Sequence, residues 1–262
     1  MKIIDPSYEI LSCPNGDEIL ALLERAGRVC YKSEDKIEPG FEICKECEGS
    51  GMVAMEQYSE MTDTIYGARL EKCFKCKGVG KIKTGKPSSH KMIKMILDKG
   101  HESVIEHSSI TVKFICNRGF ANELVRHRLA SFSQESSRYC LYSKEKFGRQ
   151  ITVIRPPYWN CGEDVCKYDR WRAAMTYAEE VYLKLIKEGA KAEEARGVLP
   201  IDVKTEIVMT CNFRELRHVF KLRTSPAAHP SMRQLMIPLL EDIKKRIPIL
   251  FDDIEVNEKA RV

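Results

Sequence analysis

Two cysteine pairs with the same short spacing constrain the folding of this 262-residue chain most strongly. The pairs are Cys44 with Cys47 and Cys73 with Cys76, and 25 residues separate them. A two-residue spacer lets both thiolates of a pair reach one ion, and Zn²⁺ takes four such ligands in a tetrahedron. Each pair is followed by x-Gly-x-Gly, and glycine permits the positive φ that aims amide N–H groups at sulfur. The spacing predicts a closed, structural zinc site.

The composition around the pairs also sets this stretch apart. Glycine, lysine, glutamate and cysteine dominate between residues 36 and 87, and apolar periodicity fades there. Few large apolar side chains are available, so such a segment needs a metal to hold a fold. We interpret residues 40–86 as an inserted zinc-binding-like subdomain. Four thiolates leave no open coordination position, so we assign the site no catalysis.

Other interpretations of the cysteine segment stay open. The four cysteines could form two disulfides, although disulfides are rare in a reducing compartment. They could also form a redox pair. The second half of the segment is basic, which favours a solvated face over a nucleic-acid contact. The lysines concerned are Lys72, Lys75, Lys77, Lys81, Lys83 and Lys86.

Composition and charge suit a soluble protein. The chain has 43% hydrophobic and 31% charged residues and a net charge of +5. That charge suits small anionic substrates and is well short of a dedicated nucleic-acid binder. No apolar run approaches the ~18–20 residues that span a bilayer, and the first residues lack a signal-peptide layout. We expect a cytoplasmic protein with no membrane contact.

Hydrophobic periodicity outside the cysteine segment predicts more helix than strand. Helices are predicted over residues 17–27, 88–100, 120–128, 168–188, 192–196, 213–222 and 231–247, and strands over 109–116, 151–154 and 202–210. Pro238 should kink or interrupt the last helix. Strands and helices do not alternate regularly, so the predicted class is α+β, loosely α/β, with a mixed sheet and flanking helices.

Residues 126–139 carry three arginines, a histidine and four serines. Buried charges and hydroxyls need partners that cannot all be found, so this segment cannot be a core element. It is typical of a donor-rich loop that holds a polyanion, because guanidinium forks and hydroxyls match phosphate oxygens. A solvated helix end is the alternative.

Three segments carry a family resemblance. Residues 126–139 contain Arg-His-Arg, a serine three residues later, and then Ser-x-Arg-Tyr. Residues 101–107 read His-Glu-Ser-Val-Ile-Glu-His, and residues 212–223 contain Asn-x-Arg and end in Leu-Arg. In sequence and order these resemble the flavin-dependent thymidylate synthases. The cysteine repeats resemble those of Hsp40-type chaperones.

The resemblance implies a function. Its members methylate dUMP reductively to dTMP, with methylenetetrahydrofolate as carbon donor and NADPH-reduced FAD as hydride source. It also implies a homotetramer with active sites at subunit interfaces and a catalytic domain over residues 1–262. The chain has no G-x-G-x-x-G motif, so the flavin is implied by the resemblance alone.

The resemblance also assigns residues. Arg223 is the catalytic residue, because a guanidinium beside the uracil edge stabilises negative charge on the ring. The residues implied to contact dUMP are Glu123, Arg126, Gln134, Ser136, Arg138, Arg196 and Arg223. The residues implied to contact FAD are His101, Ser103, Glu106, Arg126, His127, Arg128, Asn212, Arg214 and His218.

Three positions depart from the family pattern. Gln134 stands where many relatives have Glu, and Glu123 stands where many have Gln. His218 stands where Asn is more common. The first two changes leave the local sign of charge open, although hydrogen-bonding capacity survives.

Rival interpretations concern single residues and the whole chain. His101 and His107 could suggest a metal site, but a separation of six is poor spacing for one helical face. Ser136 has no clear base partner, which favours binding over nucleophilic attack. A zinc-containing nucleic-acid-binding protein is the runner-up. A cysteine-nucleophile thymidylate synthase is a second rival, with Cys161 as its candidate.

Overall fold

The computed structural model describes residues 1–59, 64–159 and 165–256, and for residues 56–59 and 64–66 it describes the backbone alone. Two units make up the chain. Met1–Ile19 and Glu102–Val262 form the first, here called the sheet unit, and Leu20–His101 form the second, here called the cysteine unit. Within the described residues, no helix is long and apolar enough to cross a membrane.

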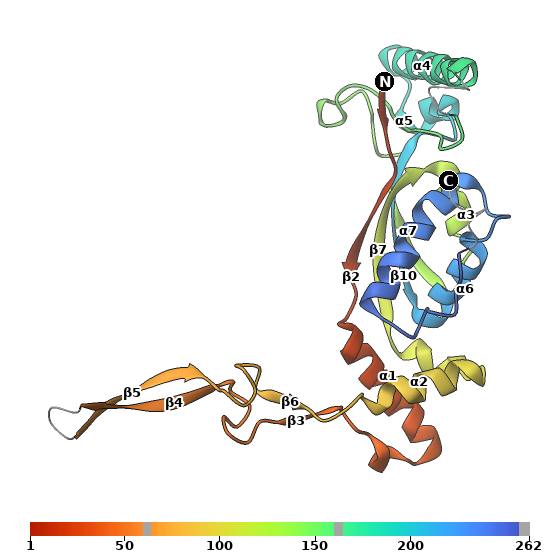
Figure 1. Cartoon of the computed structure of the whole chain (residues 1–262). Coiled ribbons are helices and arrows are strands. Elements are labelled where there is room, and N and C mark those ends of the chain that lie inside the picture. The colour runs from red at the N-terminus through yellow and green to blue at the C-terminus, as the bar shows by residue number, and fades with distance from the viewer. Residues whose placement is uncertain (60–63, 160–164, 257–262) are drawn as a thin grey trace. The chain divides into compact units, whose positions relative to one another are not determined.

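The sheet unit is built on a four-stranded antiparallel sheet in the order β2-β7-β10-β8 (Figure 1). Its strands are β2 (Ser7–Ser12), β7 (Ser109–Asn117), β10 (Lys204–Asn212) and β8 (Ala130–Gln134). β10 pairs along its full length with β7, and its C-terminal half also pairs with β8. Cys211 lies opposite Ala130, and Ile207 lies opposite Gln134. β8 is therefore an edge strand whose two ends lie at opposite ends of this ladder.

One face of the sheet carries the core because its strands alternate buried and half-exposed residues. On β7 the buried set includes Val112 and Phe114, and on β10 it includes Ile207 and Met209. Helices α3 (Arg118–Leu124), α6 (Phe213–Arg223) and α7 (Pro230–Arg246) cover this face (Figure 1). Arg223 at the end of α6 is hydrogen-bonded to Glu123 near the end of α3.

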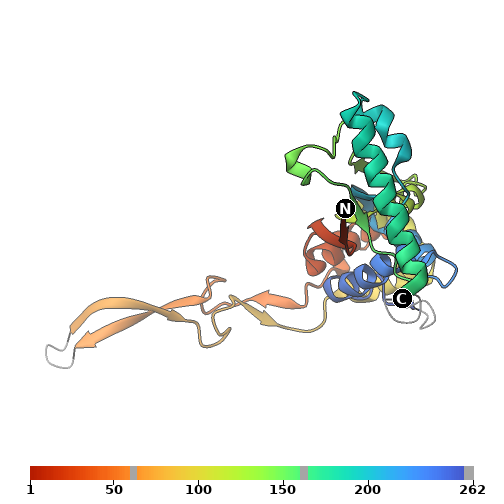
Figure 2. The same ribbon diagram turned by 90° about the horizontal axis from the view of Figure 1, so that it is seen from above.

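A second, smaller cluster surrounds a parallel pair of strands. β1 (Lys2–Ile4) pairs with β9 (Thr152–Ile154), and an antiparallel bridge joins Val153 to Val203 just before β10. The long helix α4 (Val165–Lys187) and the short α5 (Ala192–Ala195) belong to this part, and Trp171 and Tyr182 lie in its core. Figure 2 shows α4 along its length. Parallel and antiparallel ladders flanked by helices confirm the predicted α+β class.

Three local predictions for the sheet unit were wrong at least in part. Residues 130–134 form β8 and not a loop, because pairing with β10 satisfies the backbone while Ser131 and Ser133 stay exposed. α7 runs through Pro238 without interruption. The predicted helix over 120–128 ends at Leu124, which leaves residues 126–128 in the turn before β8.

The cysteine unit contains α1 (Gly16–Tyr31), whose first residues belong to the sheet unit, and α2 (Ser88–Asp98). Between them a short 3-10 helix covers Glu34–Lys36. The antiparallel pairs β3 (Phe41–Ile43) with β6 (Lys81–Lys83) and β4 (Met52–Ser59) with β5 (Thr64–Lys72) follow. Figures 1 and 2 show β4 and β5 as a twisted ribbon.

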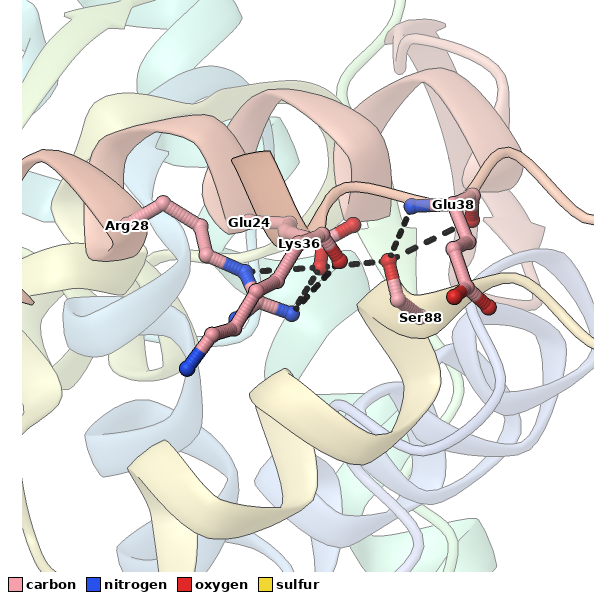
Figure 3. Close-up of polar contacts among 5 residues, drawn as sticks. All are labelled: Glu24, Arg28, Lys36, Glu38 and Ser88. Carbon is pink, nitrogen blue, oxygen red and sulfur yellow. Dashed lines mark hydrogen bonds and ion pairs between the residues drawn. The ribbon is translucent and has the colours of Figure 1, made fainter. Parts of the chain in front are cut away.

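A buried carboxylate links α1 to the start of α2. Glu24 is 2% exposed, and its Oε1 accepts hydrogen bonds from the Ser88 hydroxyl at 2.7 Å and from Arg28 at 2.9 Å. Arg28 also donates to the carbonyl of Lys36, and the Glu38 amide donates to the Ser88 hydroxyl (Figure 3). These bonds fix the chain where it leaves α1 and where it returns to α2.

An ion pair near the end of the chain gives a stability prediction. Arg217 on α6 is 3% exposed and donates to both Asp253 carboxylate oxygens at 2.7 and 2.6 Å. Its hydrogen bonds hold the pKa of Asp253 below the usual range. The stabilisation is therefore present above pH ~3.9, the ordinary pKa of Asp, and is lost as the pH falls through the lower folded-state pKa.

We expect Asp253→Asn to lower the free energy of unfolding at pH 7 by about 1–3 kcal/mol, because a buried cation loses charged acceptors. Urea unfolding at pH 7 and pH 3 checks this, and the difference between the two proteins should shrink at pH 3. Asp169→Asn, at an exposed pair 4.0 Å from Arg172, is the control. An equal loss at both pH values would contradict the ion-pair explanation.

Candidate functional site

The site is organised around the two ends of α6. Asn212, the last residue of β10, caps the helix, and its side chain accepts from the Glu215 amide at 2.9 Å. Arg223 is the last residue of the helix. Since α6 follows β10 directly, its polar residues lie beside the turn that leads into β8.

Arg223 is held by residues of the same unit. Its Nε donates to His127 Nε2 at 3.0 Å, and its NH1 donates to the Glu123 carboxylate at 2.8 Å. Its NH2 donates to the Glu123 backbone carbonyl at 3.0 Å. Three of the five guanidinium N–H groups are thus fixed. One N–H on each terminal nitrogen remains for a ligand, as far as the described residues show.

His127 is buried and neutral in this setting. Burial lowers its pKa from the ordinary value, and the neighbouring Arg223 cation lowers it further. Its Nδ1 lies 3.2 Å from Glu215 Oε1, which acts in the opposite direction. The His218 ring meets the His127 ring edge-on, with centroids 5.6 Å apart.

Two neighbouring cavities open beside these residues. The larger has a volume of about 550 Å³ and lies between the 3-10 helix Glu102–His107 and α6. The smaller has a volume of about 290 Å³ and lies over the Arg126–Arg128 turn. Both are lined by Leu129, Glu215 and His218, so the two cavities adjoin. Together they are called here the recess along α6.

The smaller cavity is strongly cationic. Arg126 and Arg128 line it and are exposed, and neither side chain has a hydrogen bond or ion pair within the described part of the chain. Their guanidinium forks are available for an anion, and phosphate oxygens match that geometry. The two side chains are unpaired here, and their binding of an anion stays a prediction.

The 101–107 segment is only partly brought to the site. Arg214 donates to Glu106 at 2.5 Å, and both residues line the larger cavity. Ser103 is exposed on the same 3-10 helix but does not line the cavity. His101 belongs to the cysteine unit, where its Nδ1 lies 2.8 Å from the Tyr31 hydroxyl. The roles of Ser103 and His101 stay predictions.

The predicted dUMP residues divide between two places. Glu123, Arg126 and Arg223 lie at the end of β8 that begins with Ala130. The other end of β8 is about 14 Å away along a five-residue strand. Gln134 ends β8, Ser136 and Arg138 follow it, and Arg138 pairs with Glu193, which is three residues before Arg196.

The second group also has internal contacts. Gln134 donates to the Thr205 hydroxyl at 3.2 Å, and Arg138 pairs with Glu193 at 3.3 Å. Arg196 is exposed in the 3-10 helix that follows α5. The smaller cavity, which Arg126 and Arg223 line, has none of this second group in its lining.

In the cysteine unit, all four paired cysteines meet. Their sulfur atoms lie within 4.8 Å of one another and are buried. Cys44 and Cys73 sulfurs are 3.8 Å apart, and Cys47 and Cys76 sulfurs are 3.6 Å apart. A tetrahedron with Zn–S bonds of ~2.3 Å has an edge of about 3.8 Å, whereas a disulfide needs about 2.0 Å. The four thiols fit a tetrahedral metal ion and are not disulfides.

The glycines complete this site as the sequence predicts. Gly51 and Gly80 have positive φ, and their amides donate to the sulfurs of Cys47 at 3.3 Å and Cys76 at 3.1 Å. A Cβ at Gly51 would lie 2.3 Å from the Gly78 carbonyl oxygen. Only glycine fits there, and its N–H group stabilises thiolate charge.

Glu215 was missed from the sequence. It reads as an ordinary exposed helix residue, yet it is 6% exposed and bonded to His127. His127, Glu215 and His218 also have ligand-type atoms within 4.8 Å of one another. Both nitrogens of His127 already have partners, and the Arg223 cation adjoins one of them, so a metal ion is disfavoured there.

Fold and site together define an α+β protein with a cationic recess at one end of an antiparallel sheet. The family model described as "Thymidylate synthase complementing protein" matches residues 15–249. The chain belongs to this family.

Relatives and a solved structure agree with the family. The flavin-dependent thymidylate synthase of Pyrococcus abyssi is 38% identical over 152 residues, which cover 58% of this chain and 61% of that protein. The match thus spans about three fifths of that relative. The flavin-dependent thymidylate synthase of Geobacter sulfurreducens is 30% identical over 204 residues, with 77% and 85% covered. The UMP/dUMP methylase PolB of Streptomyces cacaoi, solved with 5-Br dUMP, has the same fold, with a TM-score of 0.65, 20% identity and 96% coverage of both chains.

Proposed function

We propose that this protein is a flavin-dependent thymidylate synthase that converts dUMP to dTMP. Methylenetetrahydrofolate is the proposed carbon donor, and FAD reduced by NADPH is the proposed hydride source. The observation that supports it most is the Arg223 guanidinium, which is fixed on three sides beside two unpaired arginines. The family match over residues 15–249 agrees with this proposal.

Arg223 would act on the nucleotide base. Its two remaining N–H groups would donate to the uracil edge and stabilise the negative charge that develops when the ring accepts hydride. The contact requires no reorientation of the guanidinium, because His127 and Glu123 hold it already. The Glu123 carboxylate keeps one terminal nitrogen from turning away.

The recess along α6 fits the flavin coenzyme. Arg126 and Arg128 would bind its diphosphate, and Asn212, Arg214 and His218 would line the remaining part of the recess. When bound there, the flavin would supply hydride chemistry to the pyrimidine. The chain's own contribution is to supply cations for the phosphates and to hold Arg214 by its ion pair with Glu106.

The separation of the two dUMP groups supports an active site shared between subunits. Arg138 follows the end of β8 that is far from Arg223, and it pairs with Glu193, three residues before Arg196. We therefore assign the Arg223 group and the Arg138–Arg196 group at one nucleotide to different chains. A second copy would supply the Arg138–Arg196 group. We propose the homotetramer that the family resemblance implies, with dUMP held between chains and Arg138 on its phosphate.

The cysteine cluster supports a structural zinc ion in the inserted subdomain over residues 40–86. Four buried sulfurs at tetrahedral spacing with amide donors are the supporting observations. All ten cysteines within the described residues are free thiols, which supports the proposed cytoplasmic location.

Tritium release from 5-tritiated dUMP tests the proposed function. We expect release with methylenetetrahydrofolate, NADPH and FAD, and at most a few per cent of that rate once the flavin is stripped. Restoring FAD should restore the rate, and visible flavin absorbance should accompany the active protein. Colourless protein that releases no tritium and binds DNA with steep salt dependence would instead support the nucleic-acid-binding alternative.

A further inference from the structure

We propose that Glu215 is a positioning residue for Arg223, acting through the tautomer of His127. The inference rests on the proposed function because it takes Arg223 as the residue that contacts the base. Glu215 and Arg223 lie at opposite ends of α6, and His127 from the turn after α3 bridges them.

The tautomer follows from the donors present. Arginine has N–H donors and no acceptor, so His127 Nε2, which lies 3.0 Å from Arg223 Nε, must be the acceptor. A neutral imidazole with Nε2 unprotonated carries its proton on Nδ1. That Nδ1–H group faces Glu215 Oε1 at 3.2 Å. The Glu215 carboxylate can accept a hydrogen bond from Nδ1–H. It therefore disfavours the tautomer that carries its proton on Nε2.

Glu215 is itself held in place. Its backbone amide donates to the Asn212 side chain, and the residue is buried. The result is an ordered sequence of contacts from a helix cap through a carboxylate and an imidazole to a guanidinium. Without the carboxylate, the opposite tautomer would place an N–H group against the Arg223 Nε–H group, and the two donors would repel.

Protonation of His127 should release Arg223 in the same way. The charged and titratable groups that surround the ring are Glu215, His218 and Arg223 on α6, Glu123 on α3, and the exposed Arg126 and Arg128 of its own turn. Glu215 is the nearest anion, so replacing it with the neutral, similarly shaped glutamine should make His127 harder to protonate.

The kinetic test uses the full-length, FAD-loaded enzyme and 5-tritiated dUMP. We expect Glu215→Ala to lower kcat and kcat/KM together by about 10-fold or more, as loss of an orienting partner commonly does. Glu215→Gln keeps an acceptor for Nδ1–H and should stay within about threefold of wild type. Its acidic limb in the pH profile of kcat should move to lower pH, which a merely structural role would not cause.

A matched control separates positioning from stability. Glu179 on α4 is 8% exposed and accepts from the Ile151 amide at 2.9 Å in another part of the same unit. Glu179→Ala should lower thermal stability and leave kcat per flavin-loaded chain unchanged. Loss of kcat in Glu179→Ala equal to that in Glu215→Ala would overturn the positioning role.

A second measurement reads the His127 tautomer in the wild-type protein and does not depend on turnover. In ¹⁵N-labelled wild-type protein, His127, assigned by comparison with His127→Gln, should show the Nδ1–H tautomer at pH 7.5. An Nε2–H or doubly protonated ring would overturn the proposal. If the tautomer is as expected but wild type makes no dTMP, the proposed function fails while this local arrangement stands.

Discussion

Replacing Arg223 with alanine is expected to reduce dTMP formation by about 10²–10³-fold, the effect of losing one fixed donor to a developing anion. The guanidinium carries two N–H groups that find no partner among the described residues and three that hold it in place. Truncation removes both functions together. Single-turnover tritium release on flavin-loaded protein measures the loss directly.

Arg223→Lys sharpens this test. Lysine keeps the positive charge but lacks the fork, so it cannot donate to His127, Glu123 and substrate in one geometry. We expect Lys to recover at most a tenth of the lost activity. If Lys restored wild-type rates, charge alone would suffice and the fixed geometry would be irrelevant.

Two controls accompany the Arg223 variants. Arg172→Ala removes an exposed arginine of α4 and should leave the rate unchanged. Cys161→Ala should also leave it largely intact, although Cys161 lies outside the residues that the structure describes. An inactive Cys161 variant beside an active Arg223 variant would favour the cysteine-nucleophile rival.

Replacing Cys44 with serine is expected to reduce bound zinc from about one ion per chain to nearly none. The four sulfurs lie within 4.8 Å of one another, so each is expected to supply one of the four ligands of a single ion. Among the side chains that the structure describes, the apolar ones packed against the cluster are Val53 and Ile82, so little else holds this part of the fold. Elemental analysis after desalting measures the metal, and limited proteolysis within residues 40–86 measures the fold.

Cys140, which lies outside the cysteine cluster, provides the control variant for zinc content. Cys140→Ser alters a half-buried thiol of the sheet unit and should leave zinc content and protease resistance unchanged. A strong chelator should reproduce the Cys44→Ser result in wild type, since metal binding and folding are linked in such small domains. Zinc retained at one per chain in Cys44→Ser would contradict the four-thiolate site.

Local chemistry made several features predictable from sequence. The cysteine spacing and its glycines specify their own geometry, and the structure places all four sulfurs together. Asn212 directly precedes the helix predicted from residue 213, a position where asparagine is a preferred cap, and its side chain caps α6. Each of these depends on residues a few positions apart, where covalent geometry limits the outcomes.

Long-range pairing could not be predicted in the same way. Nothing near Glu215 in sequence indicates that it meets His127, 88 residues away, or that Glu123 meets Arg223, 100 residues away. Residues 130–134 were misjudged because polar side chains suggest a loop, although an edge strand satisfies its backbone through its neighbour. Tertiary contacts decide such positions.

The paired glycine turns have one further consequence. Cys44 donates its amide to the Gly80 carbonyl, and Cys73 donates its amide to the Gly51 carbonyl. Each cysteine pair is therefore hydrogen-bonded to the glycine turn of the other pair, and the ribbon of β4 and β5 only connects the two pairs along the chain. A designer could exchange that ribbon for a tight turn or a reporter peptide, and the four cysteines would keep the backbone hydrogen bonds that hold the two pairs together.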